Sequence, residues 1–410
     1  MRIRLALLAG PILLLALALA LGVWLLRRPA AQGERGPIVI GLLQALGGPT
    51  AISEAPPAAT VKLAVDEINQ GGGLLGRRVE LRIEDTRADP GAAATRLIRE
   101  QHAAALFGCW TSACRQAVRP IVEAQHQLLF YPATHEGMEQ SPNIIYTGPT
   151  PNQQLLPATD WAMHGFGRRI YLLGTAEGLF TQRAHAMLRD FILLGGGRVL
   201  GERHVPRGSA DMAAVIADLQ QLQPDLVLST LVGDSNGAFF DALVAHALTD
   251  QPLLSFRAAE PEMRAYGGGR LDRHFTAWSY LQSQAGPANE AFLARLRAAQ
   301  GENAQAGDPA VSAYVAVRLW AAAVREVGST QVEAVNANVL QQSVAAPQGY
   351  AAVDAQTRHL WRQLRIAQVT PDGQLSEVLQ TPRYIKPAPW PAFRSTEHWM
   401  AVVAHSGERP

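Results

Sequence analysis

Short apolar runs of strand length alternate with amphipathic segments of helical length, and this alternation limits the folds that the chain can adopt. Residues 37–43 form an apolar run, and residues 58–70 then carry apolar side chains at the spacing of one helix face. Residues 78–85 alternate between apolar and charged side chains, as half-buried strands do. Further strands are predicted at 104–108, 128–131, 170–174 and 226–230, and further helices at 92–102 and 112–125. This regular alternation of strands and helices predicts an α/β protein with parallel sheets and right-handed crossovers.

Two stretches interrupt the alternation and indicate passages between two halves of the fold. Residues 148–152 contain two prolines, and residues 277–282 join a strand to a new helical stretch. Between the first strand and the first helix, a loop is expected to run through Glu54. In parallel sheets, ligands bind beyond the carboxyl ends of the strands, so the loops there are the places to seek function.

The N-terminal segment, residues 1–30, is typical of an export signal. Arg2 and Arg4 precede an apolar run over 5–26, and Arg27 and Arg28 follow it. The run is long enough to act as a retained membrane anchor or as a cleaved signal. Either outcome places the rest of the chain outside the cytoplasm.

Charge and composition exclude several functional classes. The formal net charge is +1, so the chain offers no electrostatic case for nucleic acid binding. The eleven histidines are scattered, and no metal site is predicted. Cys109 and Cys114 are the only cysteines; an oxidising compartment would permit a disulfide, but two reduced, partly buried thiols are favoured.

Polar and aromatic side chains gather where predicted strands end. Residues 108–113 lead from a strand into a helix, and Thr111 and Ser112 are good helix N-caps beside Trp110. Helix N-termini leave free N–H donors that suit an anion or a carbonyl oxygen. Similar loops follow other strands at 131–137, 233–236 and 258–260. A cleft lined by aromatics and a few fixed polar groups is the default site for a small ligand.

Seven short words, dispersed in order along the chain, carry a family resemblance. The sequence resembles the urea- and short-amide-binding members of the branched-chain-amino-acid type of periplasmic binding proteins. The words are Ala51-Ile52-Ser53-Glu54, Phe107 to Ser112, Tyr131-Pro132 with Glu136-Gly137, Thr147-Gly148 with Thr150 to Gln154, Gly233 to Asn236, Ala277 to Tyr280, and Asp372-Gly373-Gln374.

The resemblance implies a type I periplasmic-binding-protein fold, with two doubly wound parallel-sheet lobes joined by three crossovers. The first lobe is expected at residues 37–148 plus about 282–365, and the second at 149–281 plus about 366–392. Residues 393–410 are expected to form a C-terminal tail.

The resemblance also implies a set of ligand-binding residues. Trp110 and Ser112 match first-lobe positions that pack on the ligand and hydrogen-bond it. The neighbouring first-lobe loop matches at Tyr131, Ala133, Thr134 and His135, and the second lobe at Glu177, Asp234 and Glu260.

The chain departs from the family pattern at two places. His135 stands where relatives usually have a tyrosine, and the stretch from Thr175 to Arg183 lacks a second-lobe tyrosine that helps to enclose the ligand. These departures bear on the identity of the ligand more than on the fold.

The resemblance therefore implies a solute-binding protein that captures urea or a short-chain amide for the membrane permease of an ABC transporter, in the periplasm or at the outer face of the cytoplasmic membrane. The alternative is a membrane-tethered sensor that signals to a kinase or regulator through the same cleft. No cofactor and no catalysis are expected. The sequence has no Walker-type phosphate loop, and Gly71-Gly72-Gly73 follows a helix rather than a strand.

Overall fold

The computed structural model describes residues 36–176 and 178–406, and its contacts divide the chain into two units, Met1–Pro37 and Ile38–Pro410. The segment expected to act as an export signal or anchor, residues 1–30, lies outside the described residues.

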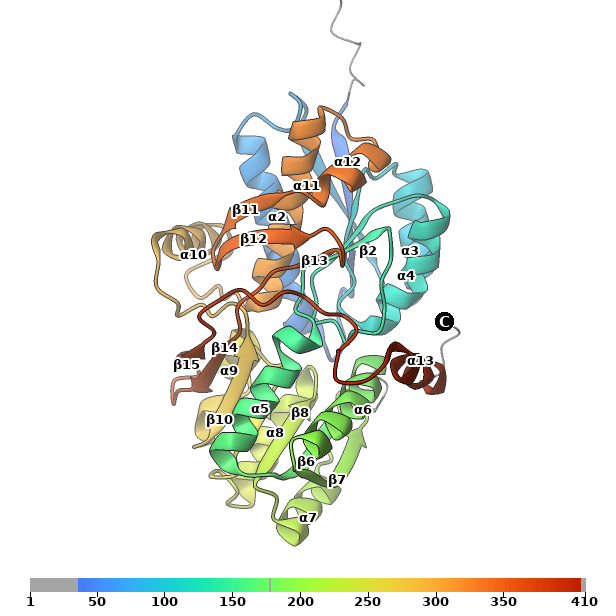
Figure 1. Ribbon diagram of the computed structural model, residues 1–410. Helices are drawn as coiled ribbons and strands as arrows, with labels where there is room; N and C mark the ends of the chain where they lie inside the picture. Colours follow the sequence, from blue (N-terminus) through green and yellow to red (C-terminus); the bar gives the residue numbers. More distant parts are fainter. Residues whose placement is uncertain (1–35, 177, 407–410) are drawn as a thin grey trace, which may run out of the picture. The chain divides into compact units, whose positions relative to one another are not determined.

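The unit Ile38–Pro410 contains two sheets (Figure 1). The first sheet has eight strands. Neighbouring strands are parallel from β13 to β2, while β11 and β12 add an antiparallel edge. In spatial order the strands are β11 (Ser343–Ala346), β12 (Gly349–Asp354), β13 (His359–Leu360), β5 (Ile144–Tyr146), β4 (Leu129–Tyr131), β3 (Leu106–Gly108), β1 (Ile38–Gln44) and β2 (Val79–Asp85).

The second sheet has seven strands, and the five that run from β10 to the edge strand β7 are parallel to one another. Strands β14 and β15 close its other edge in antiparallel pairing. The spatial order is β15 (Leu375–Gln380), β14 (Arg365–Val369), β10 (His274–Trp278), β9 (Leu253–Ser255), β8 (Leu226–Thr230), β6 (Arg169–Thr175) and β7 (Arg198–Val205).

The chain passes between the sheets three times, after β5, after β10 and after β13. Buried side chains fasten these passages. Gln154 donates to the carbonyl oxygens of Phe256 and Ala277 at 3.2 and 2.6 Å, and Arg362 pairs with Asp308 at 2.9 Å. The predicted α/β class with doubly wound, mainly parallel sheets is confirmed.

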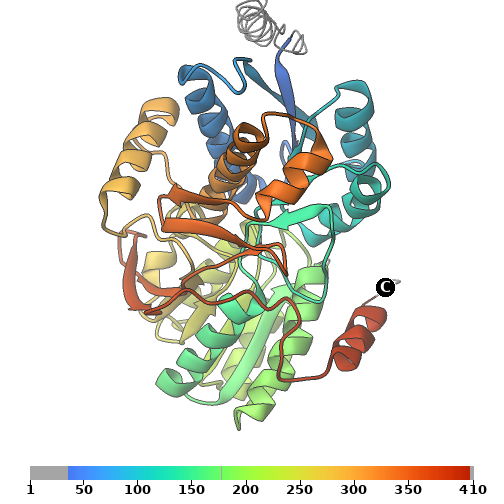
Figure 2. The same ribbon diagram turned by 45° about the horizontal axis from the view of Figure 1, so that its top comes forward.

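Helices cover both faces of each sheet, as Figures 1 and 2 show. In the first lobe, which is built on the eight-stranded sheet, one face of the sheet packs on α2, α10, α11 and α12 and the other face on α3 and α4. In the second lobe, one face packs on α5 and α6 and the other on α7, α8 and α9. Burial on both sides explains why central strands such as β4, β8 and β9 are fully buried, whereas the edge strand β2 alternates between apolar and charged residues.

The helices are α2 (Ala51–Gln70), α3 (Pro90–Thr95), α4 (Ser112–Ala124), α5 (Leu155–Phe166), α6 (Leu179–Leu194), α7 (Ala213–Leu222), α8 (Asp234–Ala245), α9 (Glu260–Ala265), α10 (Pro287–Gln300), α11 (Asp308–Val327), α12 (Val332–Val339) and α13 (Thr396–His405). A π-helical turn, Arg96–Glu100, extends α3, and short 3-10 turns lie at Pro151–Gln153 and Gly268–Arg270. The C-terminal helix α13 lies beside α6, where Ser406 accepts a hydrogen bond from Arg183 at 3.2 Å (Figure 2).

Two sequence-based expectations are corrected by the structure. Helix α2 begins at Ala51, so the loop expected through Glu54 ends earlier. The carboxylate of Glu54 accepts hydrogen bonds from Thr50 Oγ1 and Ala45 N, both at 2.8 Å, and these contacts hold the start of the helix against the end of β1.

Cys109 and Cys114 form a disulfide rather than two free thiols. The backbone turns sharply at Cys109, whose φ is +61°, and this turn brings its Cα to 5.4 Å from that of Cys114 in the first turn of α4. The five-residue separation fits a bridge because the chain folds back instead of continuing in one direction.

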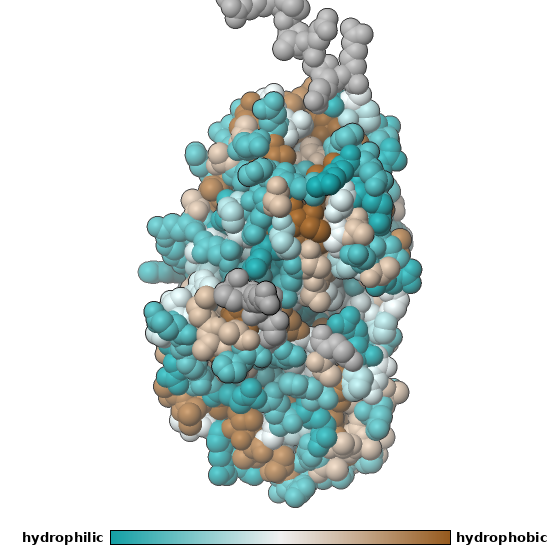
Figure 3. Space-filling model, turned by 90° about the vertical axis from the view of Figure 1, so that its right-hand side faces the viewer, coloured by the Kyte–Doolittle hydropathy of each residue, from teal (hydrophilic) through white to brown (hydrophobic). Residues whose placement is uncertain are grey.

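Within residues 36–176 and 178–406, no helix is both long and apolar enough to cross a membrane. On the face shown in Figure 3, hydrophobic residues lie in separate patches among hydrophilic ones.

Candidate functional site

The strand orders reverse at one point in each sheet, between β1 and β3 in the first and between β6 and β8 in the second. Such switch points leave a crevice beyond the carboxyl ends of the strands. A small cavity of about 30 Å³, here called the inter-sheet pocket, lies between residues of both lobes that follow the ends of strands. It is lined by Trp110, Thr111, Ser112, Ala113, Thr175, Gly178, Leu179, Phe180, Thr181, Arg207, Thr230, Val232 and Arg257.

The first-lobe wall of the pocket is the loop from β3 into α4. At Gly108 φ is +108°, and a Cβ there would lie 2.2 Å from the carbonyl oxygen of Leu43, so only glycine fits the close approach to β1. Thr111 caps α4 by accepting a hydrogen bond from Cys114 N at 3.1 Å. Together with the disulfide, these contacts fix Trp110 and Ser112 in a short, covalently closed loop.

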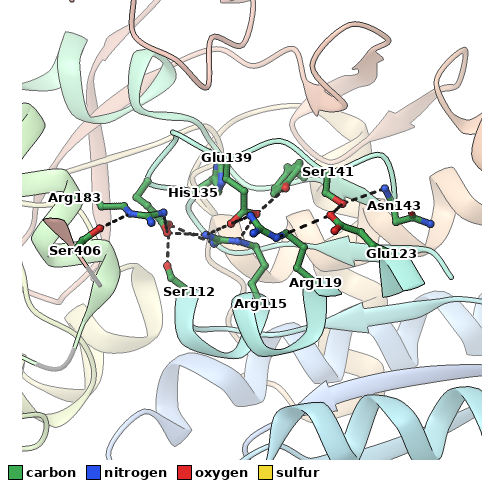
Figure 4. A network of polar contacts seen from close by, with 12 residues as sticks. Ser112, Arg115, Arg119, Glu123, His135, Glu139, Ser141, Asn143, Arg183 and Ser406 are labelled. Carbon is green, nitrogen blue, oxygen red and sulfur yellow. Dashed lines mark hydrogen bonds and ion pairs between the residues drawn. The ribbon is translucent and has the colours of Figure 1, made fainter. Parts of the chain in front are cut away.

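A buried ionic network lies behind this loop (Figure 4). Ser112 Oγ donates to Glu136 at 2.8 Å, and Arg115 pairs with Glu136 at 2.6 Å and with Glu139 at 2.9 Å. Although burial opposes the charge of Glu136, the Arg115 guanidinium holds the pKa of this carboxyl at about 2. The network therefore keeps a fully buried carboxylate ionised.

Aromatic rings surround the same network. The Arg115 guanidinium lies 4.7 Å from the centre of the Tyr131 ring, and the His135 ring packs 4.6 Å from that of Tyr146. Burial, with the Arg115 charge acting in the same direction, lowers the pKa of His135 to about 3. His135 is therefore a neutral core residue at physiological pH.

The second-lobe wall is dominated by Arg257, which follows β9 and is only 4% exposed. Its guanidinium lies 5.3 Å from the centre of the Trp110 ring and 4.5 Å from that of Phe180. Among the described residues, neither Arg257 Nε nor Trp110 Nε1 has a hydrogen-bond partner. Burial lowers the pKa of Arg257, an effect that nearby carboxylates only partly oppose. Two unpaired donors thus belong to residues that line one small cavity.

The sequence-predicted site residues separate into three groups. Trp110 and Ser112 line the inter-sheet pocket. Four more are buried near the first-lobe network but are not among the lining residues: Tyr131, Ala133, Thr134 and His135.

Two of the three second-lobe candidates, Asp234 and Glu260, are not among the residues that line the pocket. Asp234 is exposed and accepts a hydrogen bond from Tyr266 Oη at 2.6 Å. Glu260 is buried and accepts from Gln282 N at 2.6 Å, and burial raises its pKa to about 8. Glu177 lies outside the described residues.

Sequence reasoning missed the second-lobe residues that do line the pocket, above all Arg257. It lies one position before the loop 258–260 that was singled out, directly beyond a buried strand. Thr175 and Thr230 are the last residues of β6 and β8, and Arg207 follows β7. The rule that function follows strand ends would have found all four.

Residues Gly233–Gly237 match the letter pattern G-x-S-x-G of hydrolase nucleophile elbows. In the structure Ser235 is fully buried, and its Oγ accepts a hydrogen bond from Gly208 N at 2.9 Å. An elbow serine must instead expose its hydroxyl to a substrate, so this geometry does not fit a nucleophile.

A family model described as a periplasmic binding protein domain matches residues 38–396. The chain belongs to this family. Over 128 residues it is also 31% identical to a chemotactic signal transduction system substrate-binding protein, BasB, from Halobacterium salinarum; this match spans 30% of either chain.

Solved structures share the fold at low sequence identity. A solute-binding protein of an ABC transporter from R. palustris, in complex with 4-hydroxybenzoate, has a TM-score of 0.75 at 22% identity, covering 86% of this chain and 98% of that one. A second R. palustris protein, in complex with benzoate, has a TM-score of 0.77 at 21% identity, covering 86% and 99%. LivJ from Streptococcus pneumoniae, in complex with isoleucine, has a TM-score of 0.74 at 17% identity, covering 86% and 100%.

Proposed function

We propose that this protein is an extracytoplasmic solute-binding protein that captures a small ligand in the inter-sheet pocket and passes it to the membrane permease of an ABC-type transporter. Family membership over residues 38–396 supports this role, as do the R. palustris solute-binding proteins of ABC transporters that share the fold. The basic and apolar pattern of residues 1–30 supports a position outside the cytoplasm. The pocket draws residues from both lobes, as capture by lobe closure requires.

The ligand is proposed to carry a carboxylate next to a flat apolar group. The observation behind this is the pair of unpaired buried donors, Arg257 Nε and Trp110 Nε1. A buried donor without a partner costs about 1–3 kcal/mol, and more when it is charged, so a ligand that only accepts hydrogen bonds relieves that cost. The rings of Trp110 and Phe180 provide flat apolar surface beside the guanidinium. A guanidinium also matches the planar geometry of a carboxylate.

Urea or a short amide, the ligand class that the sequence resemblance favours, is the competing candidate. Urea is planar and its oxygen would accept from Arg257, but its N–H groups need acceptors, for which the pocket offers the hydroxyls of Thr175, Thr181 and Thr230. Urea has four heavy atoms, and at roughly 1.5 kcal/mol per atom its affinity is limited to a dissociation constant of tens of micromolar.

Calorimetric titration of the full-length chain with benzoate, 4-hydroxybenzoate, isoleucine, acetamide and urea distinguishes these classes. We expect at least one carboxylate to bind with a micromolar dissociation constant, and benzamide, the uncharged analogue of benzoate, to bind at least tenfold more weakly than benzoate. Binding of urea or acetamide without any carboxylate would restore the amide assignment. Failure of all small solutes to bind would remove the capture role.

A sensing role is the second candidate function, and the BasB match supports it. In this role the same pocket binds the ligand, but the partner is a signalling protein instead of a permease. Deletion of the gene separates the two: loss of ligand uptake indicates transport, and loss of a response with normal uptake indicates sensing.

A further inference from the structure

Three side chains of the second lobe converge at a place apart from the lining of the inter-sheet pocket. His185 comes from α6, and Glu202 and His204 come from β7. His185 Nδ1 lies 3.0 Å from Glu202 Oε1, His204 Nε2 lies 2.8 Å from the same oxygen, and the two nitrogens are 3.2 Å apart. The three atoms therefore form a small triangle around one point.

The strand geometry explains why these residues meet. Successive side chains of a strand point to opposite faces, so Glu202 and His204 share one face of β7. Arg203, between them, turns the other way and pairs with Asp218 at 2.7 Å. His185 completes the triangle from α6. The cluster is not evident from the sequence, because His185 and His204 lie 19 positions apart.

We propose that His185, Glu202 and His204 bind a divalent first-row transition-metal ion, with Zn²⁺ as the simplest case. Two imidazole nitrogens and one carboxylate oxygen form a ligand set that proteins use for Zn²⁺. Bonds of about 2.0–2.2 Å in tetrahedral geometry place such atoms roughly 3.3–3.5 Å apart. The side chains need to separate by only a few tenths of an ångström to admit the ion.

Outer contacts hold two of the three ligands in position. His185 Nε2 lies 3.0 Å from Thr230 Oγ1, which leaves Nδ1 to face the triangle. Arg189 contacts Glu202 Oε2, which leaves Oε1 for the ion. Contacts of this kind fix the orientation of metal ligands and raise affinity. The charge of Arg189 opposes a cation, so the site is expected to be weaker than one without a neighbouring arginine.

The site opens to solvent on one side and approaches the ligand pocket on the other. The side chain of His185 is fully buried, whereas those of Glu202 and His204 are 19% and 32% exposed, so an ion can enter and keep a water as its fourth ligand. Thr230 lines the inter-sheet pocket and contacts His185. A bound ion would tie α6, which supplies Phe180 and Thr181 to the pocket, to β7.

The test is calorimetric titration of Zn²⁺ into the full-length chain after treatment with a chelator. We expect one ion per chain, and at least tenfold weaker binding by His204→Ala, whose partly exposed side chain can be removed without emptying the core. His164→Ala is the matched control: it removes an exposed histidine that lies 3.5 Å from Asp160, and it should bind Zn²⁺ like the wild type.

Co²⁺ provides a second readout that does not depend on affinity. Co²⁺ bound by two histidines and a carboxylate gives visible absorption far stronger than that of hexaaqua Co²⁺, and His204→Ala should abolish it. Equal Zn²⁺ affinity in the wild type and His204→Ala, or a hexaaqua spectrum in the wild type, would overturn the proposal. Ligand capture in the inter-sheet pocket is measured separately and does not depend on this result.

Discussion

Arg115 in the first lobe and Arg257 in the second are both buried, yet their surroundings differ. Arg115 pairs with two buried carboxylates, Glu136 and Glu139, and its pKa is raised well above the ordinary value. Arg257 faces the rings of Trp110 and Phe180, and burial lowers its pKa. The first charge forms direct ion pairs with carboxylates, whereas the second is balanced only in part by nearby carboxylates such as Glu262. This difference assigns Arg115 to the scaffold and makes Arg257 the group that a ligand would neutralise.

The largest expected effect of a single substitution is that of Arg115→Met on stability. Removing this guanidinium leaves Glu136 and Glu139 as buried carboxylates that have lost their main counter-ion, a change that typically costs about 3–5 kcal/mol. The free energy of unfolding, measured by urea denaturation, should fall by that amount. Arg82→Met, which breaks an exposed pair with Glu80, should cost at most about 1 kcal/mol. A similar small loss in both variants would mean that Arg115 does not hold the first lobe together.

Lowering the pH should also reduce the stability of the folded protein through the buried network around Glu136. Glu136 has a pKa of about 2 in the folded protein against an ordinary 4.5, so its contribution to stability is complete above about pH 4.5 and is lost as the pH falls towards 2. The loss amounts to at most about 3 kcal/mol. His135, with a pKa lowered to about 3, adds to it below its ordinary 6.5, because only the unfolded chain takes up that proton.

Urea denaturation at a series of pH values measures this effect. Glu136→Gln should flatten the dependence between pH 4.5 and 2, while its stability at neutral pH falls. An unchanged pH profile in Glu136→Gln would place the acid sensitivity elsewhere.

Arg257→Met tests the other side of the comparison. We expect the affinity for the carboxylate that binds best to fall about 30-fold or more, which is about 2 kcal/mol, because the ligand then has no charge partner in a desolvated site. Stability should fall less than in Arg115→Met, because among the described residues no carboxylate forms an ion pair with Arg257, although buried Glu262 loses a nearby positive charge. A loss of stability as large as that of Arg115→Met would show that Arg257 is a second structural arginine.

The last two substitutions concern the loop from β3 into α4, which carries Trp110 and Ser112. Trp110→Ala removes a ring wall and should weaken ligand binding about tenfold. Ser112→Ala removes one hydrogen bond to the charged carboxylate of Glu136, which is worth about 1.5–3 kcal/mol. Ser112→Ala should therefore lower stability more clearly than affinity. Calorimetry and urea denaturation of both variants measure the two effects, and normal binding by Trp110→Ala would make that residue part of the core alone.

Local patterns predicted the architecture well because buried parallel strands and their helices leave strong periodic signals. The predicted strands near Ile38, Leu106, Leu129 and Leu226 all exist, with shifts of a few residues at their ends. Helix α2 begins earlier than predicted even though it contains Pro56 and Pro57.

The site was harder to predict because it depends on side-chain direction. Trp110 and Ser112 follow a strand, and both line the pocket. Asp234 also follows a strand, but its carboxylate turns outward to Tyr266. Arg257, one position before the predicted loop 258–260, does line the pocket. Sequence position fixes where a residue leaves the sheet, and the packing around it decides whether its side chain faces the cavity.

The disulfide between Cys109 and Cys114 also holds one wall of the inter-sheet pocket in place. The bridge closes the segment that presents Trp110 and Ser112, so the shape of one pocket wall depends on the oxidation state of two sulfur atoms. In a reducing compartment the segment has no such closure, and in an oxidising one it does. Under the proposed function, the bridge restricts the motion of this wall before a ligand binds, and it does so only where the compartment oxidises thiols.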